Sequence, residues 1–299
     1  MSLRRLLPAL ALAAMLGGCV PVPTRPTATA PEAAPVSVQA SAASPNDALN
    51  AALWMQASVE YRLAAGQTWR SALTQLDRAI KTPAWDALTP EDRGGTLTAG
   101  LPLAVIVDVD ETVLDNSRYA ARLIKGDGSH GDALWLQWVK EEAAVPVPGA
   151  LEFARAAAAR GVTLFYITNR VAELAPATLS NLRKLGFPLK DDSQLLPRGA
   201  VTEGCVEAGS QKTCRRRQVG HHFRVLLAVG DSLGDLQTLP SNTPEGREAA
   251  VRPYLSWVGE RWFVLPNPVY GSWEAALYGD DRNLPEAEKR ARKQAALRD

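Results

Sequence analysis

Two aspartates, Asp108 and Asp110, follow directly on the apolar run 103–107 and are separated by a single valine. The run is rich in Val and Ile and predicts a buried strand. Side chains two positions apart leave a strand on the same face, so the two carboxylates are expected to lie together. Neighbouring carboxylates repel each other unless a cation or a shared proton relieves them. The pair therefore predicts a hard-metal site, with Mg²⁺ as the ion and one carboxylate free to act as a nucleophile.

Polar residues follow two further apolar runs in the same way. Thr168 and Asn169 end one of these runs, and Asp231 and Asp235 follow the other. In an open α/β sheet the carboxyl ends of the parallel strands share one edge, and ligands bind in the crevice beyond that edge. The three groups of polar side chains are therefore expected to meet at one site.

The order of apolar runs and helical patterns along the chain predicts an α/β fold. Strands alternate with helices, which favours a parallel sheet with right-handed crossovers. We expect a Rossmann-like three-layer core and a small α-helical cap made by the N-terminal helices of residues 47–80, which Gly66 is expected to divide. The predicted strands are 103–107, 162–168, 224–231 and 262–265, and the predicted later helices are 132–142, 150–159 and 177–185.

The composition bounds the size of the protein and its partners. Of the 299 residues, 46% are hydrophobic and 22% are charged, which is enough for one sizeable core. The formal net charge is only +1, so the sequence gives no reason to expect a nucleic-acid partner. We expect one folded domain over 47–280, followed by a charged C-terminal tail over 281–299.

Residues 1–18 have the form of a lipoprotein signal peptide, with two arginines ahead of a short apolar stretch. The segment 16–19, Leu-Gly-Gly-Cys, resembles the cleavage box of bacterial lipoproteins, so we expect a lipid on Cys19 and a membrane anchor. In lipoproteins of this kind an aspartate after the cysteine favours the inner membrane, and Val20 therefore predicts the outer membrane, facing the periplasm or the cell surface. Residues 19–46 are rich in Pro, Ala, Thr and Ser, cannot bury a core, and are expected to form a flexible tether.

Cys205 and Cys214 lie in a chain that is expected to be exported, where oxidation is permitted. A disulfide between them would close a short loop and stabilise the fold by roughly 2–3 kcal/mol. Two free thiols are the alternative. A metal site is less favoured, because His221 and His222 are the nearest imidazoles and no zinc-type spacing accompanies them.

Taken in order, the polar strand ends resemble the motifs of the haloacid dehalogenase (HAD) superfamily of phosphohydrolases. The segment 108–112 matches DxDxT, Thr168 matches the second motif, and the segment 230–235 matches GDxxxD. Longer stretches resemble the class C bacterial acid phosphatases, the outer-membrane lipoprotein acid phosphatases and 5′-nucleotidases. Those stretches are 54–61, 108–119, 166–170 and 265–273, so the likeness covers roughly residues 47–280.

The resemblance implies a metal-dependent phosphatase that works through an aspartyl-phosphate. Asp108 would be the nucleophile, and Asp110 would be the general acid that protonates the leaving oxygen and then the base that activates water. The Asp108 carboxylate, the Asp110 backbone carbonyl and the Asp231 carboxylate would hold one Mg²⁺ ion. Thr168 would hydrogen-bond a phosphoryl oxygen, with help from Asn169.

The resemblance also implies a lysine that neutralises phosphate charge. Lys212, which precedes Thr213, resembles the family's Lys-Ser step, but it lies between two cysteines and ahead of three arginines. Arg215 is therefore the first substitute to consider. Asp235 would orient a metal-bound water or the lysine.

Aromatic residues indicate the class of substrate. Trp135 and Tyr270 match positions where family members hold the ring of a nucleotide or an aromatic phosphate, whereas Trp138 is expected to be a core residue. Stacking on such rings is worth roughly 1–3 kcal/mol per base, so the expected substrates are phosphate monoesters, with 5′-nucleotides preferred. One alternative is a broad-specificity phosphatase or phosphotransferase without nucleotide preference. Another is a non-catalytic surface lipoprotein that binds a ligand on the same fold.

Overall fold

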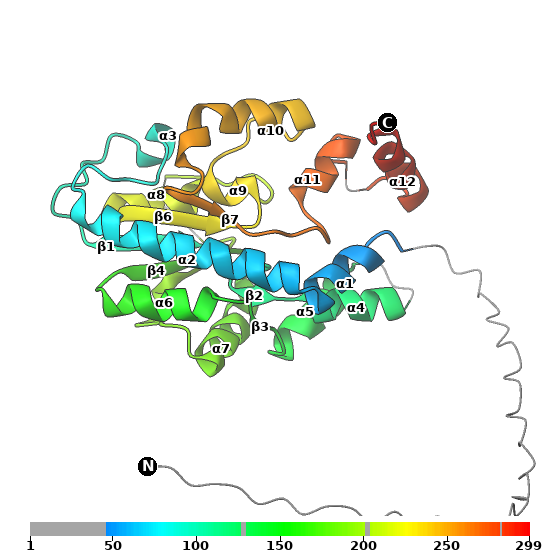
Figure 1. Cartoon of the computed structure of the whole chain (residues 1–299), viewed down its shortest axis with the longest axis horizontal. Coiled ribbons are helices and arrows are strands. Elements are labelled where there is room, and N and C mark those ends of the chain that lie inside the picture. Colours follow the sequence, from blue (N-terminus) through cyan, green and yellow to red (C-terminus); the bar gives the residue numbers. More distant parts are fainter. Residues whose placement is uncertain (1–45, 127–129, 201–203, 282) are drawn as a thin grey trace, which may run out of the picture. The chain divides into compact units, whose positions relative to one another are not determined.

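The computed structural model describes residues 46–126, 130–200, 204–281 and 283–299. Five parallel strands form one sheet in the order β5-β4-β1-β6-β7 (Figure 1). Their bounds are β1 Leu103–Val107, β4 Thr163–Val171, β5 Leu195–Arg198, β6 Arg224–Gly230 and β7 Trp262–Val264. An antiparallel two-stranded ribbon consists of β2 Leu114–Asp115 and β3 Val145–Pro146.

Helices connect these strands. The longer ones are α1 Leu49–Ala57, α2 Val59–Lys81, α4 Ser117–Lys125, α5 Asp132–Lys140, α6 Ala150–Ala159, α7 Ala175–Leu185, α8 Thr213–His222, α10 Pro244–Val251 and α12 Glu286–Ala295. The short ones are α3 Pro90–Arg93, α9 Leu233–Leu236 and α11 Ser272–Ala275, with single 3-10 segments at Ala172–Leu174, Asp192–Gln194, Arg252–Trp257 and Ala276–Tyr278. Within the described ranges, no helix is both long enough and apolar enough to span a bilayer.

The side chains of β1 show that the sheet is covered on both faces. Val105 and Val107 belong to the hydrophobic cluster that includes the buried sides of α2, α6 and α7. Ala104 and Ile106 belong to a second cluster, which includes Val219 of α8. Because successive residues leave a strand on opposite faces, the sheet lies between two helical layers. The predicted α/β fold, with a three-layer core and a parallel sheet, is confirmed (Figure 1).

The N-terminal helices divide at Ser58 and not at the predicted Gly66. The Ser58 hydroxyl accepts a hydrogen bond from the Tyr61 amide (3.0 Å) and so caps α2. Gly66 is buried inside α2, where this helix packs against α6 and the sheet. Helix α2 therefore belongs to a core layer, whereas α1 packs beside α4 at the carboxyl end of the sheet (Figure 1).

The charged segment predicted as a tail contains α12, which is tied to other elements by ion pairs. Arg290 and Lys293 each lie 3.1 Å from the carboxylate of Asp47, just before α1. Lys293 also pairs with Glu274 of α11 at 3.0 Å. These pairs hold the last helix next to the beginning of the first one.

Candidate functional site

The carboxyl ends of β1 and β6 bring three aspartates together. β1 runs directly into Asp108, whose amide donates a hydrogen bond to the Val229 carbonyl of β6 (2.9 Å). Asp231 follows β6 directly, and Asp235 lies in the short helix α9. One carboxylate oxygen from each of the three aspartates lies within 4.8 Å of the others. These three residues are called the carboxylate cluster below.

The turn after β6 fixes the direction of the Asp235 side chain. The Ser232 amide donates to Asp235 Oδ2 (2.9 Å) in a capping box at the start of α9. The backbone passes so close to this side chain that a Cβ atom at Gly230 would overlap it. With Oδ2 held by the cap, Oδ1 accepts a hydrogen bond from Lys212 Nζ (2.7 Å).

Lys212 supplies positive charge to the carboxylate cluster. Its Nζ donates to Oδ1 of Asp108 as well as to Asp235, and its side chain is only 4% exposed. Burial by itself lowers the pKa of a lysine, but the carboxylates of Asp108 and Asp235 outweigh it and raise the pKa of Lys212 to about 12. The ammonium group is therefore charged at neutral pH.

The residues of the cluster fit a divalent metal ion. Burial raises the pKa of the Asp108 carboxyl, against the opposing effect of Lys212, and burial together with Asp235 raises the pKa of Asp231 to about 7. These shifts reflect burial and the proximity of three carboxylates, whose negative charge one ammonium group does not offset. Oxygen donors in such a setting suit a hard cation of the Mg²⁺ type. The carboxylates of Asp108 and Asp231 are close enough to each other to hold such an ion.

Arg215, the alternative to Lys212, is directed to a different part of the site. Its guanidinium group pairs with Glu207 (2.7 Å) and donates to Asn169 Oδ1 (3.2 Å) and to the Thr168 carbonyl. Arg215 therefore holds the end of β4 in place. The lysine position beside Asp108 is occupied by Lys212 itself.

A disulfide joins Cys205 to Cys214, with the two Cα atoms 5.7 Å apart. Cys214 is buried in the first turn of α8, and Lys212 is the N-cap residue of that helix. The cross-link therefore ties the segment that leads to Lys212 directly to α8.

The carboxylate of Asp110 is held by side chains from two other segments of the chain. Arg170, at the end of β4, donates to Oδ1 through Nη2 (2.8 Å) and Nε (3.0 Å), and Asn116 Nδ2 donates to the same oxygen (2.9 Å). The Thr168 hydroxyl lies 3.5 Å from Oδ2. The sequence motifs contained Arg170 and Asn116, but the motifs alone assigned neither residue a role.

Two more polar side chains surround the cluster and were not singled out from the sequence. Asn267 Nδ2 donates to Asp231 Oδ2 (2.9 Å), and the Thr112 hydroxyl donates to Oδ1 (3.3 Å). Asn267 lies in the motif stretch 265–273, and Thr112 closes the first motif. Both residues orient the Asp231 carboxylate toward Asp108.

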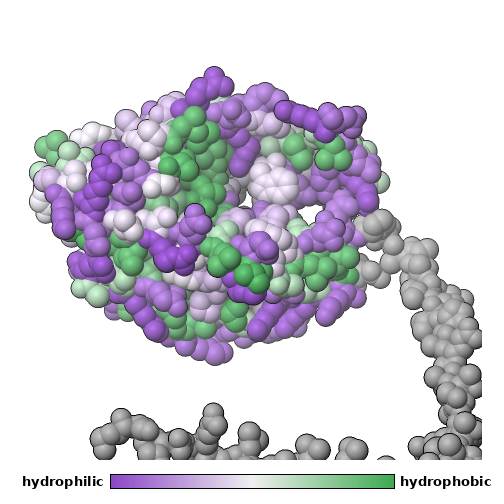
Figure 2. Space-filling view, in the orientation of Figure 1, coloured by the Kyte–Doolittle hydropathy of each residue, from purple (hydrophilic) through white to green (hydrophobic). Residues whose placement is uncertain are grey.

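The two aromatic residues expected to contact substrate contact different segments of the site. Tyr270 is 44% exposed, and its hydroxyl donates to the buried carboxylate of Glu111. The Trp135 ring is partly buried and lies 5.5 Å from the guanidinium carbon of Arg170. Trp138 is buried in the core as expected. At this end of the molecule the surface is hollowed between the part formed by α11 and α12 and the part formed by α1 and α4 (Figure 2).

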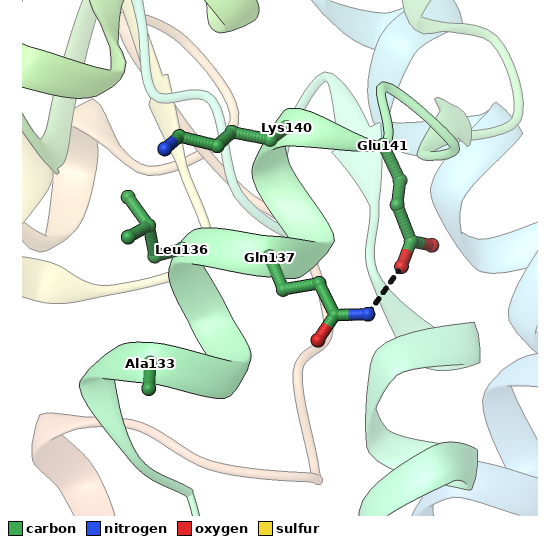
Figure 3. Close-up of a pocket in the computed structure, with 5 residues that line it drawn as sticks. All are labelled: Ala133, Leu136, Gln137, Lys140 and Glu141. Atoms are coloured by element: carbon green, nitrogen blue, oxygen red, sulfur yellow. Dashed lines mark hydrogen bonds between the residues drawn. The ribbon is translucent and has the colours of Figure 1, made fainter.

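A separate hollow of about 370 Å³ lies on helix α5 (Figure 3). Its lining residues are Ala133, Leu136, Gln137, Lys140 and Glu141. Trp138 and Val139, which are buried, leave the same helix on its inner side. The lining therefore contains neither the carboxylate cluster nor the predicted substrate-binding aromatics.

Comparison with known proteins gives a consistent set of relatives. Residues 27–273 match the family model described as HAD superfamily, subfamily IIIB (acid phosphatase). The structure is similar to that of the class C acid phosphatase from Bacillus anthracis, with a TM-score of 0.72 and 28% identity over 84% of this chain and 97% of that chain. A second structure of that protein, with tungstate bound, gives the same values.

Plant proteins show a more limited similarity. Acid phosphatase 1 of Solanum lycopersicum is 27% identical over 165 residues, and the stem 31 kDa glycoprotein of Glycine max is 24% identical over 165 residues. The matched region is 55% of this chain and 57% and 58% of these two relatives. The chain therefore spans little more than half the length of these curated relatives.

Proposed function

Because this chain belongs to subfamily IIIB of the HAD superfamily, the acid phosphatases, we propose that it is a metal-dependent phosphatase that hydrolyses phosphate monoesters. The observation that carries the proposal is the meeting of Asp108, Lys212 and Asp231 at one edge of the sheet. The tungstate bound by the Bacillus anthracis relative is a tetrahedral oxyanion similar in shape to phosphate, which supports the same class of ligand here.

The proposed reaction proceeds through an aspartyl-phosphate on Asp108. An Asp108 oxygen attacks phosphorus, the bond from phosphorus to the alcohol oxygen breaks, and Asp110 gives its proton to that oxygen. Asp110 is then a carboxylate, and it removes a proton from the water that attacks the same phosphorus. Inorganic phosphate leaves and the Asp108 carboxylate is restored.

The other residues of the site bind the phosphate and the metal ion in this proposal. Lys212, held by Asp235, faces the phosphate charge, and the Thr168 hydroxyl and Asn169 donate to phosphoryl oxygens. The carboxylates of Asp108 and Asp231 and the Asp110 backbone carbonyl would hold one Mg²⁺ ion. When bound, the ion offsets the repulsion between an anionic nucleophile and an anionic phosphate.

We further propose that 5′-nucleotides are the preferred substrates. Support comes from Trp135 and Tyr270, whose rings contact Arg170 and Glu111, two residues next to the proposed catalytic groups. Rings of this kind stack on any nucleobase. A phosphatase or phosphotransferase of broad specificity is the alternative, since the phosphate-binding groups would serve any monoester.

Replacing both Trp135 and Tyr270 by Ala is expected to lower kcat/KM for a nucleoside 5′-monophosphate much more than for a small aliphatic phosphate. The phosphate-binding groups act on both substrates, so their contribution cancels in the ratio of the two kcat/KM values. Two lost stacking contacts of roughly 1–3 kcal/mol each would change this ratio by one to several orders of magnitude.

A second double variant, with Tyr254 and Trp257 replaced by Ala, is the matched control. These two residues form an aromatic contact against the opposite face of the sheet, so the control removes the same side-chain types away from the site. The ratio should stay constant in the control. An equal loss for both substrates in the Trp135 and Tyr270 variant would identify a phosphatase without nucleotide preference.

The protein is proposed to be a lipid-anchored lipoprotein of the outer membrane. Residue Cys19 within the Leu-Gly-Gly-Cys segment, followed by Val20, supports this location. These residues lie outside the part of the chain that the structure describes, as do the whole signal peptide and nearly all of the tether.

Cys19→Ser is expected to prevent lipid attachment, because the hydroxyl does not replace the thiol in the transfer. The variant should leave the membrane fraction and should not incorporate labelled fatty acid. Val20→Asp is the informative companion, since it keeps the lipidated cysteine and should move the protein from the outer to the inner membrane. Fatty acid label in the Cys19→Ser variant would show that the cleavage box is assigned to the wrong residue.

A further inference from the structure

We propose that Arg170 and Asn116 are positioning residues for Asp110 and that they leave Oδ2 as the oxygen that carries the transferred proton. The inference rests on the proposed role of Asp110 as general acid. It adds which oxygen of the carboxyl group acts and which residues select it.

The two oxygens of Asp110 have unequal surroundings. Oδ1 accepts from Arg170 Nη2 (2.8 Å), from Arg170 Nε (3.0 Å) and from Asn116 Nδ2 (2.9 Å). A carboxylate oxygen has two lone pairs, so three donors at these distances occupy it fully. A proton on Oδ1 would have to displace one of these donors.

Oδ2 is held much less tightly. Arg170 Nε lies 3.2 Å from it, and the Thr168 hydroxyl lies 3.5 Å from it. The Thr168 hydroxyl is also the group proposed to bind a phosphoryl oxygen, so Oδ2 faces the place where the ester would lie. Of the two oxygens, Oδ2 has the longer hydrogen bonds and the direction that proton transfer requires.

The orientation of Asn116 is determined by Trp138. The Trp138 indole N–H donates to Asn116 Oδ1 (2.8 Å), and an indole nitrogen can only donate. Oδ1 is thereby the amide oxygen, and the amide NH₂ group must be the one that points at Asp110. Trp138 is 1% exposed, so a core residue sets the direction of a hydrogen bond in the site.

The guanidinium group of Arg170 is equally well fixed. It is 2% exposed, donates through Nη1 to the Thr178 hydroxyl (3.2 Å), and lies against the Trp135 ring. A planar guanidinium held in this way presents its donors in one geometry, which a flexible ammonium group does not. Arg170 therefore fixes both the position of the carboxyl group and its rotation.

The contact between Arg170 and Asp110 also stabilises the negative charge that Asp110 gains when it gives up its proton. As the ester bond to phosphorus breaks, the proton on Oδ2 passes to the alcohol oxygen and the bonding electron pair stays with Asp110. The carboxylate that results already faces the Arg170 cation (2.8 Å). No group has to move to stabilise it.

The test compares two substrates with one ring each, p-nitrophenyl phosphate and benzyl phosphate. p-Nitrophenolate leaves as a stable anion without a proton, whereas benzyl alcohol needs the proton from Asp110. The readout is kcat/KM, which reports the steps up to formation of the phosphoenzyme. The variants are Arg170→Lys, which keeps the charge without the planar fork, and Trp138→Phe, which keeps the ring without the indole N–H. Asp110→Asn is the reference for complete loss of the acid.

Arg170→Lys is expected to lower kcat/KM for benzyl phosphate on the order of 100-fold, and to change that for p-nitrophenyl phosphate by less than about 10-fold. Trp138→Phe should lower kcat/KM for benzyl phosphate relative to that for p-nitrophenyl phosphate in the same direction, but by a smaller factor. Arg93→Met is the matched control, because Arg93 is also buried and doubly hydrogen-bonded to a carboxylate, that of Asp86, away from the site. For Arg93→Met, the ratio of kcat/KM for benzyl phosphate to that for p-nitrophenyl phosphate should equal the wild-type ratio.

The results distinguish the positioning role of Arg170 and Asn116 from the role of Asp110 as general acid. If Asp110→Asn is selective for benzyl phosphate while both other variants lose activity equally on the two substrates, Arg170 and Asn116 are structural only and the inference is overturned. If Asp110→Asn itself affects both substrates equally, the assignment of Asp110 as general acid fails instead. Thermal unfolding of each variant, measured beside its activity, identifies any loss that comes from misfolding.

Discussion

Asp108→Asn is expected to abolish turnover and to leave the fold intact. The amide has nearly the size and shape of the carboxylate, but it is a poor nucleophile toward phosphorus, so the aspartyl-phosphate cannot form. Removal of an essential nucleophile typically costs a factor on the order of 10⁴ or more in kcat. The measurement is steady-state hydrolysis of a phosphate monoester, together with the thermal unfolding midpoint.

Asp92→Asn provides the control for removing a buried carboxylate. Asp92 is 2% exposed and pairs with Arg216 at 2.6 Å, so its loss should lower stability while turnover by the folded protein continues. An Asp108→Asn protein that kept more than a few per cent of wild-type activity would show that another residue attacks phosphorus.

Exhaustive chelation is expected to inactivate the protein, and Mg²⁺ is expected to restore it. Without a cation, Asp108 and Asp231 would face the phosphate as bare or partly protonated acids close to each other. Removal should lower activity by several orders of magnitude, because the charge of the ion acts directly on the reacting phosphate. Full activity of protein that is verified to be metal-free would exclude the proposed metal dependence.

The pH dependence of metal binding follows from the same cluster. Burial raises the pKa of Asp231 to about 7, so the metal-free carboxyl holds a proton below that pH and is ionised above it. A cation has to displace this proton, and its apparent affinity should therefore rise as the pH increases through 7. Titration of the apoprotein with Mg²⁺ at acid and at alkaline pH measures this shift.

The sequence predicted the strands that consist of continuous runs of apolar residues. β1, β4, β6 and β7 are apolar runs, and each was expected. β5 was missed because it has four residues and includes Pro197, which an edge strand tolerates and a central strand does not. The division at Ser58 was missed because a buried glycine breaks the apolar pattern more visibly than a cap does.

The residues of the site depend on side-chain direction, which local sequence does not determine. Lys212 and Arg215 were open alternatives, since both lie at the start of the same helix. Only the packing of α8 against β4 and β6 shows that Arg215 turns to the Thr168 carbonyl and Lys212 to Asp108. Arg170 and Asn116 escaped notice for the same reason, because their role depends on meeting Asp110 from two other segments.

The ion pairs between Asp47 and helix α12 have a consequence for how the domain is connected to its surroundings. Arg290 and Lys293 hold the final helix beside the point where the folded domain begins, so the two ends of the domain lie on one side of it. Ends that are neighbours can be joined by a short linker and reopened elsewhere, which makes this domain a natural candidate for circular permutation. A cargo fused after α12 would likewise lie beside the start of the folded domain at Asp47.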